Sequence, residues 1–427
     1  MAVPPSPPVR AWWTLGFLLG GLVLMGCLPP SSPPVRTGAE VLAANQFDAL
    51  AGERVGLIVN HTARVDSAHL IDRVHQAPTV ELGALFGPEH GLRGTAGAGK
   101  AVTDNRDDRT GVPVYSLYGD SRRPTSAELE GIDALVFDVQ DVGARFYTYI
   151  TTMGLAMQAA AEADLRFVVL DRPNPLGGTY VSGFSLSPQH RSFVGRYPIP
   201  IAHGMTVGEL ARMIKGEEWL PGLSGLNLTV IPAEGWSRSQ QWPATQRDWI
   251  APSPNLPTWE TALVYPGMCF FEGLQVNEGR GTDHPFLQIG LPWPRGAAAA
   301  VADTLRARAL PGIRVNTTTI TPTSRPAAPS PRFEGEQLPG LRLRVTDAGA
   351  VRPVELGIHA VHAVYHQARA LGDTSIISRP RHLSRLAGTG RLSALLHAGA
   401  SPRRIIDSWA NAVATFREQR APYLLYD

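Results

Sequence analysis

Residues 54–60 of this 427-residue chain read RVGLIVN, a polar start followed by a short apolar run. Such a run is typical of a strand that is buried on both faces of a parallel sheet. The next segment, residues 67–76 (SAHLIDRVHQ), has Leu70, Ile71 and Val74 at helical spacing. A buried strand followed by a helix begins a βαβ unit, so this stretch predicts an α/β fold.

The same alternation continues as far as residue 171. Further strands are expected at 80–86 (VELGALF), 133–139 (DALVFDV) and 166–171 (RFVVLD), and an Ala- and Met-rich helix is expected at 149–163. Alternating strands and helices imply a parallel sheet that is covered by helices on both faces. We therefore predict a Rossmann-like parallel-sheet domain.

Beyond residue 216 the pattern is less regular. Residues 235–259 carry four tryptophans and several prolines, and irregular segments of this length are usually functional in compact domains. Helical patterns return from about residue 355. We predict a catalytic domain at 40–235 and a second, smaller α/β domain at 236–427 that completes a cleft, with an α+β arrangement as the alternative.

Composition excludes several classes of protein. The formal net charge is +2 and no block of Lys or Arg occurs, so no nucleic-acid partner is expected. The two cysteines, Cys27 and Cys269, exclude a disulfide framework, and Cys269 is expected to be a small buried hydrophobe. No cofactor or metal is expected, because Asp283 and His284 lack a convincing set of further ligands.

The N-terminus resembles a lipoprotein-type signal peptide. Arg10 precedes the apolar run AWWTLGFLLGGLVLMGC, which ends in Gly26 and Cys27. A charged start, a short apolar core and a small residue before the cleavage point describe a secretory signal. The alternative, a transmembrane anchor, is disfavoured because the run is shorter than the roughly 20 residues that a spanning helix needs.

This reading sets expectations for location. Residues 1–27 would be the signal peptide, Cys27 would carry the lipid, and residues 28–39 (LPPSSPPVRTGA) would be a Pro/Ser tether without a core. We expect an exported protein that is anchored to a membrane through Cys27 and faces the periplasm or the cell exterior.

Polar residues follow each of the four predicted strands. Ligands of open α/β sheets bind beyond the carboxyl ends of the strands, so these residues are expected to face one crevice. They are Asn60 and His61, Glu89 and His90, Asp138, Gln140 and Asp141, and Asp171, Arg172 and Asn174.

Glu89 lies in FGPEHGLRG (86–94), where Pro88 and Gly91 favour a tight turn. A partly desolvated carboxyl group at such a turn has a raised pKa and can act as a general acid. The alternative is a structural Glu that pairs with Arg93 or caps a helix.

The same region offers a nucleotide-site reading, which we reject. Gly94, Gly99 and Lys100 fit the spacing of a phosphate-binding loop, but Ala101 stands where a Ser or Thr should hold magnesium. The segment that follows is turn-like and predicts no helix whose N-terminus could face a phosphate. A Gly/Ala loop that lines a cleft is the better interpretation.

The stretch DVQDVGARFYTY (138–149) combines carboxylates, a cation and aromatic rings. Asp138 and Asp141 could take part in catalysis or cap the following helix. Arg145 could clamp an anionic group of a substrate, and Tyr147 could stack on a sugar or belong to the core.

A second polar stretch, EGLQVNEGRGTDHPF (272–286), places Glu272, Glu278 and Arg280 among glycines. Gly279 and Gly281 permit backbone turns that aim the flanking side chains, so a substrate loop is the preferred reading.

His203 stands just before a helix signal. Thr206, followed three residues later by Glu209, has the pattern of a capping box. A structural role and a ligand-facing role for His203 both remain open.

Seven of these stretches, in order, resemble the bacterial exo-β-N-acetylmuramidase family over residues 40–427. They are FGPEHGLRG, GVPVYSLYG, FDVQDVGARFYTYI, LDRPNPLGG, IPIAHGMTVGELA, APSPNLPTWETALVYPG and EGLQVNEGRGTDHPF. The resemblance implies a glycoside hydrolase that releases N-acetylmuramic acid from the non-reducing end of peptidoglycan fragments. It also implies an active site between a Rossmann-like domain and a smaller C-terminal domain.

The resemblance also implies roles for individual residues. Glu89 would be the catalytic acid, and Asp138, Asp141, Glu278 or the N-acetyl group of the substrate would assist attack, so retention and inversion both remain open. Arg145 or Arg280 would bind the lactyl carboxylate, and the tryptophan-rich segment would form the pocket wall. The implied substrate-binding residues are Asn60, His61, His90, Arg93, Arg145, Tyr147, Asn174, His203, Asn255 and Arg280. The alternatives are a non-catalytic cell-wall-binding lipoprotein on the same fold and an esterase.

Overall fold

The computed structural model describes residues 1–8, 33–89, 91–92, 105–119 and 121–427. Pro34–Asp427 forms one compact unit, separate from Met1–Pro33. The predictions for the apolar run, Cys27, His90, Arg93 and the glycine loop at 94–100 lie outside the described residues.

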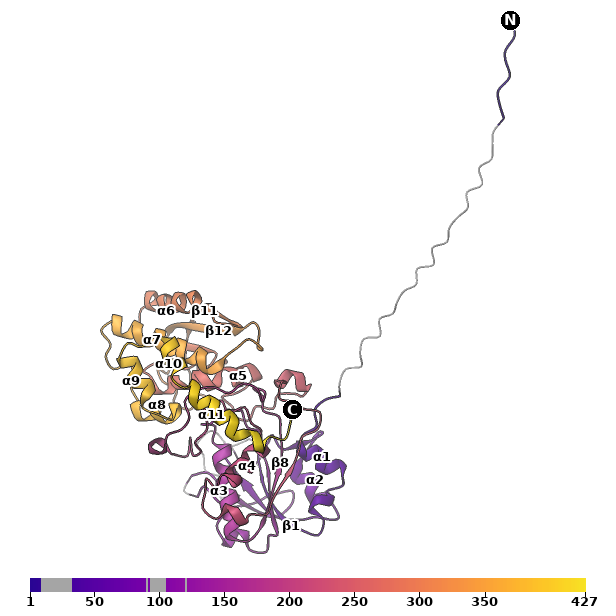
Figure 1. Ribbon diagram of the computed structural model, residues 1–427, viewed down its shortest axis with the longest axis vertical. Coiled ribbons are helices and arrows are strands. Elements are labelled where there is room, and N and C mark those ends of the chain that lie inside the picture. The colour runs from indigo at the N-terminus through magenta and orange to yellow at the C-terminus, as the bar shows by residue number, and fades with distance from the viewer. Residues whose placement is uncertain (9–32, 90, 93–104, 120) are drawn as a thin grey trace. The chain divides into compact units, whose positions relative to one another are not determined.

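The four predicted strands are present and lie side by side in one sheet (Figure 1). They are β1 (Arg54–Val59), β4 (Glu81–Gly87), β7 (Ala134–Asp138) and β8 (Arg166–Leu170), in the order β4-β1-β7-β8 with every pair parallel. Parallel strands β6 (Pro113–Ser116) and β9 (Leu228–Ile231) extend the sheet on its two sides, and the short β5 (Asn105–Arg106) adds an antiparallel edge. The prediction of a Rossmann-like sheet is confirmed.

Helices cover both faces of this sheet because successive strand residues point to opposite sides. In β7, Leu135 and Phe137 enter a core that also holds Met153 and Leu210. Ala134 and Val136 of β7 enter the other core, which also contains residues of α1 and α2. The covering helices are α3 (Tyr149–Glu162) and α4 (Val207–Gly216) on one face, and α1 (Gly38–Ala44) and α2 (Leu70–Gln76) on the other (Figure 1).

Two local boundaries differ from the sequence expectation. The helix predicted at 67–76 begins only at Leu70, because the preceding residues form a hairpin of β2 (Arg64–Val65) and β3 (Ala68–His69). The predicted tether at 28–39 is wrong at its C-terminal end, since Val35 is buried and Thr37 caps α1.

The C-terminal part is an α+β arrangement, the alternative in the sequence reading. Its sheet is antiparallel, in the order β10 (Gln288–Gly290), β12 (Leu338–Val345), β11 (Ile313–Ile320). The helices around it are α5 (Trp259–Met268), α6 (Arg295–Ala307), α7 (Pro353–Ala370), α8 (Pro380–Ala387), α9 (Arg391–His397), α10 (Pro402–Asp407) and α11 (Ala410–Arg420). Short 3-10 turns lie at Asp48–Leu50, Ala127–Leu129, Pro188–His190, Leu223–Gly225, Trp242–Thr245, Cys269–Gly273 and Ala421–Tyr423.

The last residues of the chain return to the parallel-sheet part. The Tyr426 hydroxyl donates to Asp171 at 2.6 Å, directly after β8. The Leu425 amide donates to Glu209 at 2.9 Å, and Glu209 also forms the predicted capping box with Thr206, which is confirmed. The chain terminus therefore stabilises the start of α4.

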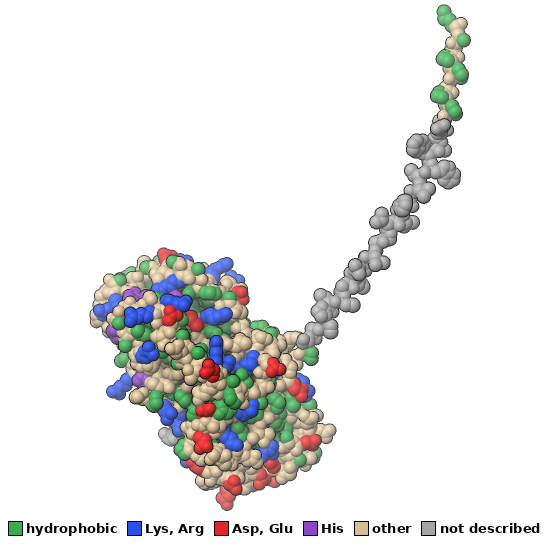
Figure 2. All heavy atoms as spheres, viewed as in Figure 1, with side chains coloured by type: hydrophobic (Ala, Val, Ile, Leu, Met, Phe, Trp, Pro, Cys, Tyr) green, Lys and Arg blue, Asp and Glu red, His purple; other side chains and the backbone are tan. Residues whose placement is uncertain are grey.

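The surface carries mixed charges. On the face shown in Figure 2, basic and acidic side chains are interspersed and form no continuous basic stripe. Cys269 is buried, as expected. Within the described ranges, no helix is long and apolar enough to cross a membrane.

The contact between α5 and α7 yields a stability prediction. A methyl group added at Gly267 would overlap the carbonyl of Pro353 and the backbone of Gly357, whereas one added at Gly296 in α6 would meet open space. We expect Gly267→Ala to lower the free energy of unfolding by roughly 3 kcal/mol, measured by chemical denaturation, because the backbone cannot yield. Gly296→Ala should instead raise it by up to about 1 kcal/mol. Equal effects of the two variants would contradict this account of the packing.

Candidate functional site

A cavity of about 230 Å³ lies beside Glu89 and brings together side chains from both parts of the chain. We call it the acid pocket. Glu89, Tyr147 and Thr148 come from the parallel-sheet part, and Glu272 and Arg280 come from the C-terminal part. Its other polar lining residues are Tyr118, Tyr149, Ser253, Asn255 and His382.

Glu89 follows the carboxyl end of β4, on a tight turn as predicted. The Gly91 amide donates to the Pro88 carbonyl at 3.0 Å, and Gly91 has a φ of 72°, which favours glycine. The Thr148 hydroxyl donates to Glu89 at 3.2 Å, and Tyr118 also hydrogen-bonds to this carboxyl group.

Burial raises the pKa of Glu89 above its usual value. The hydrogen bonds from Thr148 and Tyr118 and the charge of Arg280 lower this pKa but do not cancel the effect of burial, and the charge of Glu272 raises it further. A carboxyl group with a raised pKa keeps its proton at higher pH, which is what a general acid requires.

Glu272 has the opposite electrostatic setting. It accepts a hydrogen bond from Arg280 at 2.7 Å and lies 2.9 Å from the Nε2 atom of His382. Burial alone would raise the pKa of Glu272, but the charges and hydrogen bonds of Arg280 and His382 outweigh it and lower the pKa to about 2. The pocket therefore holds one carboxyl group that favours its proton and one that stays ionised.

Glu278 lies behind this pair. Arg280 is 3.2 Å from Glu278, and burial raises the pKa of Glu278 despite that cation. Gly279 and Gly281 both have positive φ, which confirms the predicted turns of this loop. Glu278 supports Arg280 and does not line the acid pocket, so the carboxylate opposite Glu89 is Glu272.

Asp138 and Asp141 also fail to line the acid pocket. Arg172 pairs with Asp138, with one contact of 3.0 Å, and donates to the Thr62 carbonyl at 3.0 Å. Asp141 accepts from the Gly143 amide at 2.7 Å and lies 3.6 Å from the ring of His203. Both aspartates hold the loop after β7, so neither is placed as a partner of Glu89.

Arg145 cannot clamp a substrate from its position. Its side chain is 0% exposed and donates to the carbonyls of Phe184 at 2.6 Å, Ile199 at 3.0 Å and Leu386 at 2.7 Å. The predicted anion clamp is wrong, because the guanidinium donates its hydrogen bonds to backbone carbonyls and none is directed at the pocket.

Several other predicted binding residues also hold the backbone. Asn60 donates to the Tyr149 hydroxyl at 3.0 Å, and Asn174 donates to the Met205 carbonyl at 2.9 Å. The buried ring of His203 accepts from the Met205 amide at 3.2 Å, which favours its structural role.

Three remaining predicted residues differ in their access to the acid pocket. The half-buried ring of His61 lies 2.7 Å from the Ala251 carbonyl, outside the pocket lining. Asn255 lines the pocket and donates to the Ala327 carbonyl at 2.7 Å. Tyr147 lines the pocket with its ring 4.9 Å from that of Tyr149.

The tryptophan-rich segment contributes to the pocket through other residues. Ser253 and Asn255 line the acid pocket, whereas Trp242 packs on Trp249 and Trp236 packs on Tyr426. The segment therefore contributes to the pocket wall, but its tryptophans do not line the pocket.

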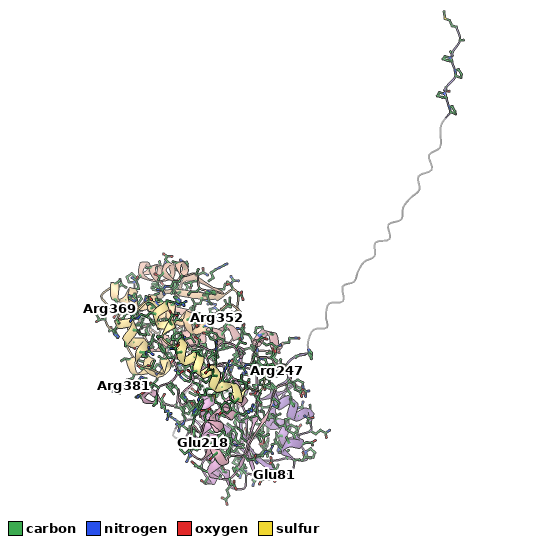
Figure 3. All side chains as sticks on the ribbon, in the orientation of Figure 1. Glu81, Glu218, Arg247, Arg352, Arg369 and Arg381 are labelled. Atoms are coloured by element: carbon green, nitrogen blue, oxygen red, sulfur yellow. The ribbon has the colours of Figure 1, made fainter. Side chains whose placement is uncertain are left out.

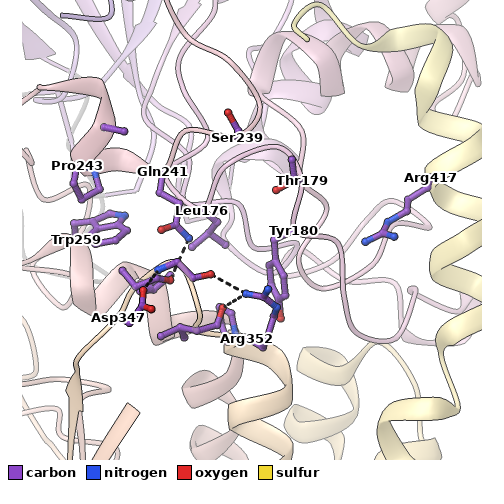
Figure 4. A pocket seen from close by; sticks show the side chains of 16 residues that line it. Leu176, Thr179, Tyr180, Ser239, Gln241, Pro243, Trp259, Asp347, Arg352 and Arg417 are labelled. Atoms are coloured by element: carbon purple, nitrogen blue, oxygen red, sulfur yellow. Dashed lines mark hydrogen bonds between the residues drawn. The ribbon is translucent and has the colours of Figure 1, made fainter. Parts of the chain in front are cut away.

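A larger cavity, of about 590 Å³, lies elsewhere and includes Trp259, which lies near Pro243 in Figure 4. Its lining carboxylate, Asp347, accepts from the Gly349 and Ala350 amides. It holds no pair of carboxyl groups among the residues that line it, so its greater volume does not make it the better candidate for acid–base chemistry.

Sequence reasoning missed Tyr118, Thr148, Ser253, Glu272 and His382 as site residues, although Glu272 was named in the polar stretch 272–286. Tyr118, Thr148 and Ser253 lie in the stretches GVPVYSLYG, DVQDVGARFYTY and APSPNLPTWETALVYPG, which were singled out for other reasons. Their membership of these stretches could have indicated that they belong to the site. His382 lies in RPRHLSRL, which offers no pattern, and only the packing of α8 brings it to Glu272.

Comparisons with known proteins identify the family of the chain. The sequence matches the description "Exo-beta-N-acetylmuramidase NamZ, N-terminal" over residues 55–260 and the corresponding C-terminal description over residues 263–426. It is 38% identical to peptidoglycan beta-N-acetylmuramidase NamZ of Bacillus subtilis strain 168, over 97% of this chain and 99% of that protein.

Two crystal structures of DUF1343 family proteins from Bacteroides fragilis NCTC 9343 share the fold. Both are 35% identical to this chain and cover 92% of it and 99% of their own chains, with TM-scores of 0.84 and 0.76. Since the two family matches together span most of the sequence, the chain belongs to the exo-β-N-acetylmuramidase NamZ family.

Proposed function

We propose that the protein is an exo-acting β-N-acetylmuramidase that releases N-acetylmuramic acid from the non-reducing end of peptidoglycan fragments. The observation that carries this proposal is the pair formed by Glu89, which favours its proton, and Glu272, which stays ionised, in one pocket. Pairs of carboxyl groups whose environments push their pKa values apart are the usual acid and base assignments of glycosidases. The Bacillus subtilis relative is named for the same activity.

The two carboxyl groups would divide the chemistry. Glu89 would give its proton to the glycosidic oxygen as the bond to the anomeric carbon breaks. Glu272, held by Arg280 and His382, would face the positive charge that develops on the sugar ring. Attack at the anomeric carbon would then fall to Glu272, to a water molecule or to the N-acetyl group of the substrate.

The size of the acid pocket supports action on a terminal sugar. Its volume of about 230 Å³ is below the roughly 300–1,000 Å³ of pockets for drug-sized ligands. One sugar residue therefore suits it better than a glycan chain that passes through.

We further propose that the protein is exported and anchored by a lipid on Cys27. Support comes from Arg10, the apolar run and the Gly26-Cys27 pair, which together have the order of a lipoprotein signal. The anchored protein would face the periplasm or the cell exterior, where peptidoglycan fragments arise.

The role of Glu89 is tested by Glu89→Gln. We expect kcat on the disaccharide of N-acetylmuramic acid and N-acetylglucosamine to fall by about 10²- to 10⁴-fold, because the leaving oxygen is no longer protonated. The loss on a nitrophenyl muramic acid glycoside should be smaller, because nitrophenolate leaves without a proton. Glu81→Gln, at an exposed residue in the strand β4 that leads to Glu89 (Figure 3), is the matched control and should leave both rates unchanged.

Near-normal hydrolysis of the disaccharide by Glu89→Gln would remove Glu89 as the acid. No hydrolysis of either substrate by the wild-type protein would favour the non-catalytic wall-binding alternative.

The hydrogen bond from Tyr118 yields a prediction for pH dependence. This bond lowers the pKa of Glu89, so Tyr118→Phe should raise that pKa. Because the acid is lost as pH rises through the pKa of Glu89, the alkaline limb of kcat/KM should move to higher pH in the variant. Tyr115→Phe, whose ring packs on Phe86, is the control and should not move the limb. A limb that stays in place or moves to lower pH in Tyr118→Phe would contradict the assignment.

Lipidation is tested on the full-length precursor expressed in a bacterium and labelled with radioactive palmitate. We expect Cys27→Ser to abolish labelling and to shift the protein from the membrane fraction, whereas Cys269→Ala, at the buried cysteine, should keep both. Persistent labelling of Cys27→Ser would show that another residue carries the lipid, and an unlabelled wild-type protein would show that there is no lipid anchor.

A further inference from the structure

Another cavity, of about 460 Å³, is lined by residues from two segments of the chain that also supply residues to the acid pocket. It is lined by Gln189, His190, Arg191, Pro380, Arg381, Ser384 and Arg385, and we call it the basic pocket. The segment that supplies His190 and Arg191 continues into Phe193 and Val194, which line the acid pocket. The two cavities are therefore neighbours along this segment.

Helix α8 provides the other shared wall. Arg381 and Arg385, four residues apart, lie on one face of the helix and line the basic pocket. His382 and Leu386, displaced by one residue each, lie on the next face and line the acid pocket. His382 also contacts Glu272 at 2.9 Å. Helix α8 therefore supplies one residue in contact with the catalytic pair and adjacent residues that line the basic pocket.

The cations of the basic pocket are not engaged by the protein. Arg191, Arg381 and Arg385 are exposed, and across the described parts of the chain their side chains make no ion pair or hydrogen bond. No Asp or Glu lines the pocket. Two arginines near the acid pocket and the sheet, Arg280 and Arg172, are by contrast paired with carboxylates. A concave site with several unpaired guanidinium groups attracts an anion.

We propose that the basic pocket binds a carboxylate of the peptidoglycan fragment beyond the sugar that is cleaved. This inference rests on the proposed function. The terminal muramic acid fills the acid pocket, so the rest of the fragment must cross the adjoining surface. Every further muramic residue brings a carboxylate, either its free lactyl group or the carboxylates of an attached stem peptide. A guanidinium binds such a group through two parallel hydrogen bonds.

The test uses Arg381→Gln combined with Arg385→Gln. We expect kcat/KM to fall roughly five- to tenfold through KM on an extended substrate, as the loss of two exposed charge pairs implies. The extended substrates are a peptide-free tetrasaccharide with two muramic residues and the same tetrasaccharide with a stem peptide on its second muramic residue. The nitrophenyl muramic acid glycoside, which has no extension, should be hydrolysed at the wild-type rate.

The substrate that loses affinity identifies the source of the carboxylate. It is the peptide-free tetrasaccharide if the source is a second lactyl group, and the peptide-bearing tetrasaccharide if the source is the stem peptide. Arg369→Gln, at an exposed arginine of α7 that does not line the basic pocket, is the matched control and should leave KM on both extended substrates unchanged. Figure 3 labels both Arg369 and Arg381. The proposal would be overturned if the double arginine variant had unchanged KM values on both extended substrates, or if its kcat/KM fell equally on the nitrophenyl glycoside.

Binding separates this proposal from the proposed function. The affinity of Glu89→Gln for the tetrasaccharide should be salt-sensitive and should fall when the two arginines are also replaced, even if no substrate is cleaved. A tetramer of N-acetylglucosamine, which lacks carboxylates, should bind equally to both variants. Hydrolysis with no effect of the arginines on binding would refute the basic pocket alone.

Discussion

The buried guanidinium of Arg145 is the interaction on which the acid pocket depends most. It joins the loop after β7 to two carbonyls of the segment 184–199 and to the Leu386 carbonyl of α8. Each of these three elements also supplies lining residues to the acid pocket. A buried cation is stable only when its hydrogen bonds are made, and a buried carbonyl is stable only when it has a donor. The geometry around Glu89 and the fold of the surrounding segments therefore require each other.

A second set of contacts fixes Glu89 from the sheet side. Asn60, directly after β1, donates to the Tyr149 hydroxyl, and that hydroxyl donates to the Pro252 carbonyl at 2.9 Å and lies 3.3 Å from the Glu89 carbonyl. Residues at neighbouring strand ends thus position one another before any substrate is present. This explains why so many polar side chains follow the strands and so few of them face the pocket: most satisfy the backbone of the loops that carry the others.

The fold was predictable because its signals are local. The apolar runs of β1, β4, β7 and β8 and the capping box at Thr206 are each readable within a dozen residues, and their order implies the parallel sheet. Glu89 was predictable for the same reason, since its turn lies within a few residues. Distant partners were not predictable: Arg172 lies 34 residues from Asp138, Leu386 lies 241 residues from Arg145 and His382 lies 110 residues from Glu272 in the chain. No pattern within one segment shows whether a carboxylate or a guanidinium will meet a substrate or another part of the protein.

Electrostatics explains why Glu89 and Glu272, chemically equal in the sequence, differ in the folded protein. Two carboxylates that share a small pocket cannot both be ionised at low cost unless a cation compensates one of them. Arg280 and His382 are bound to Glu272 and not to Glu89, so they lower the pKa of Glu272, whereas burial raises the pKa of Glu89. Arg280 also lies 3.2 Å from Glu278, so both of its carboxylate contacts are on the C-terminal side of the pocket. The difference between the pKa values of Glu89 and Glu272 therefore depends on the position of Arg280. That position is fixed by the folded loop at 272–286 and not by either glutamate alone.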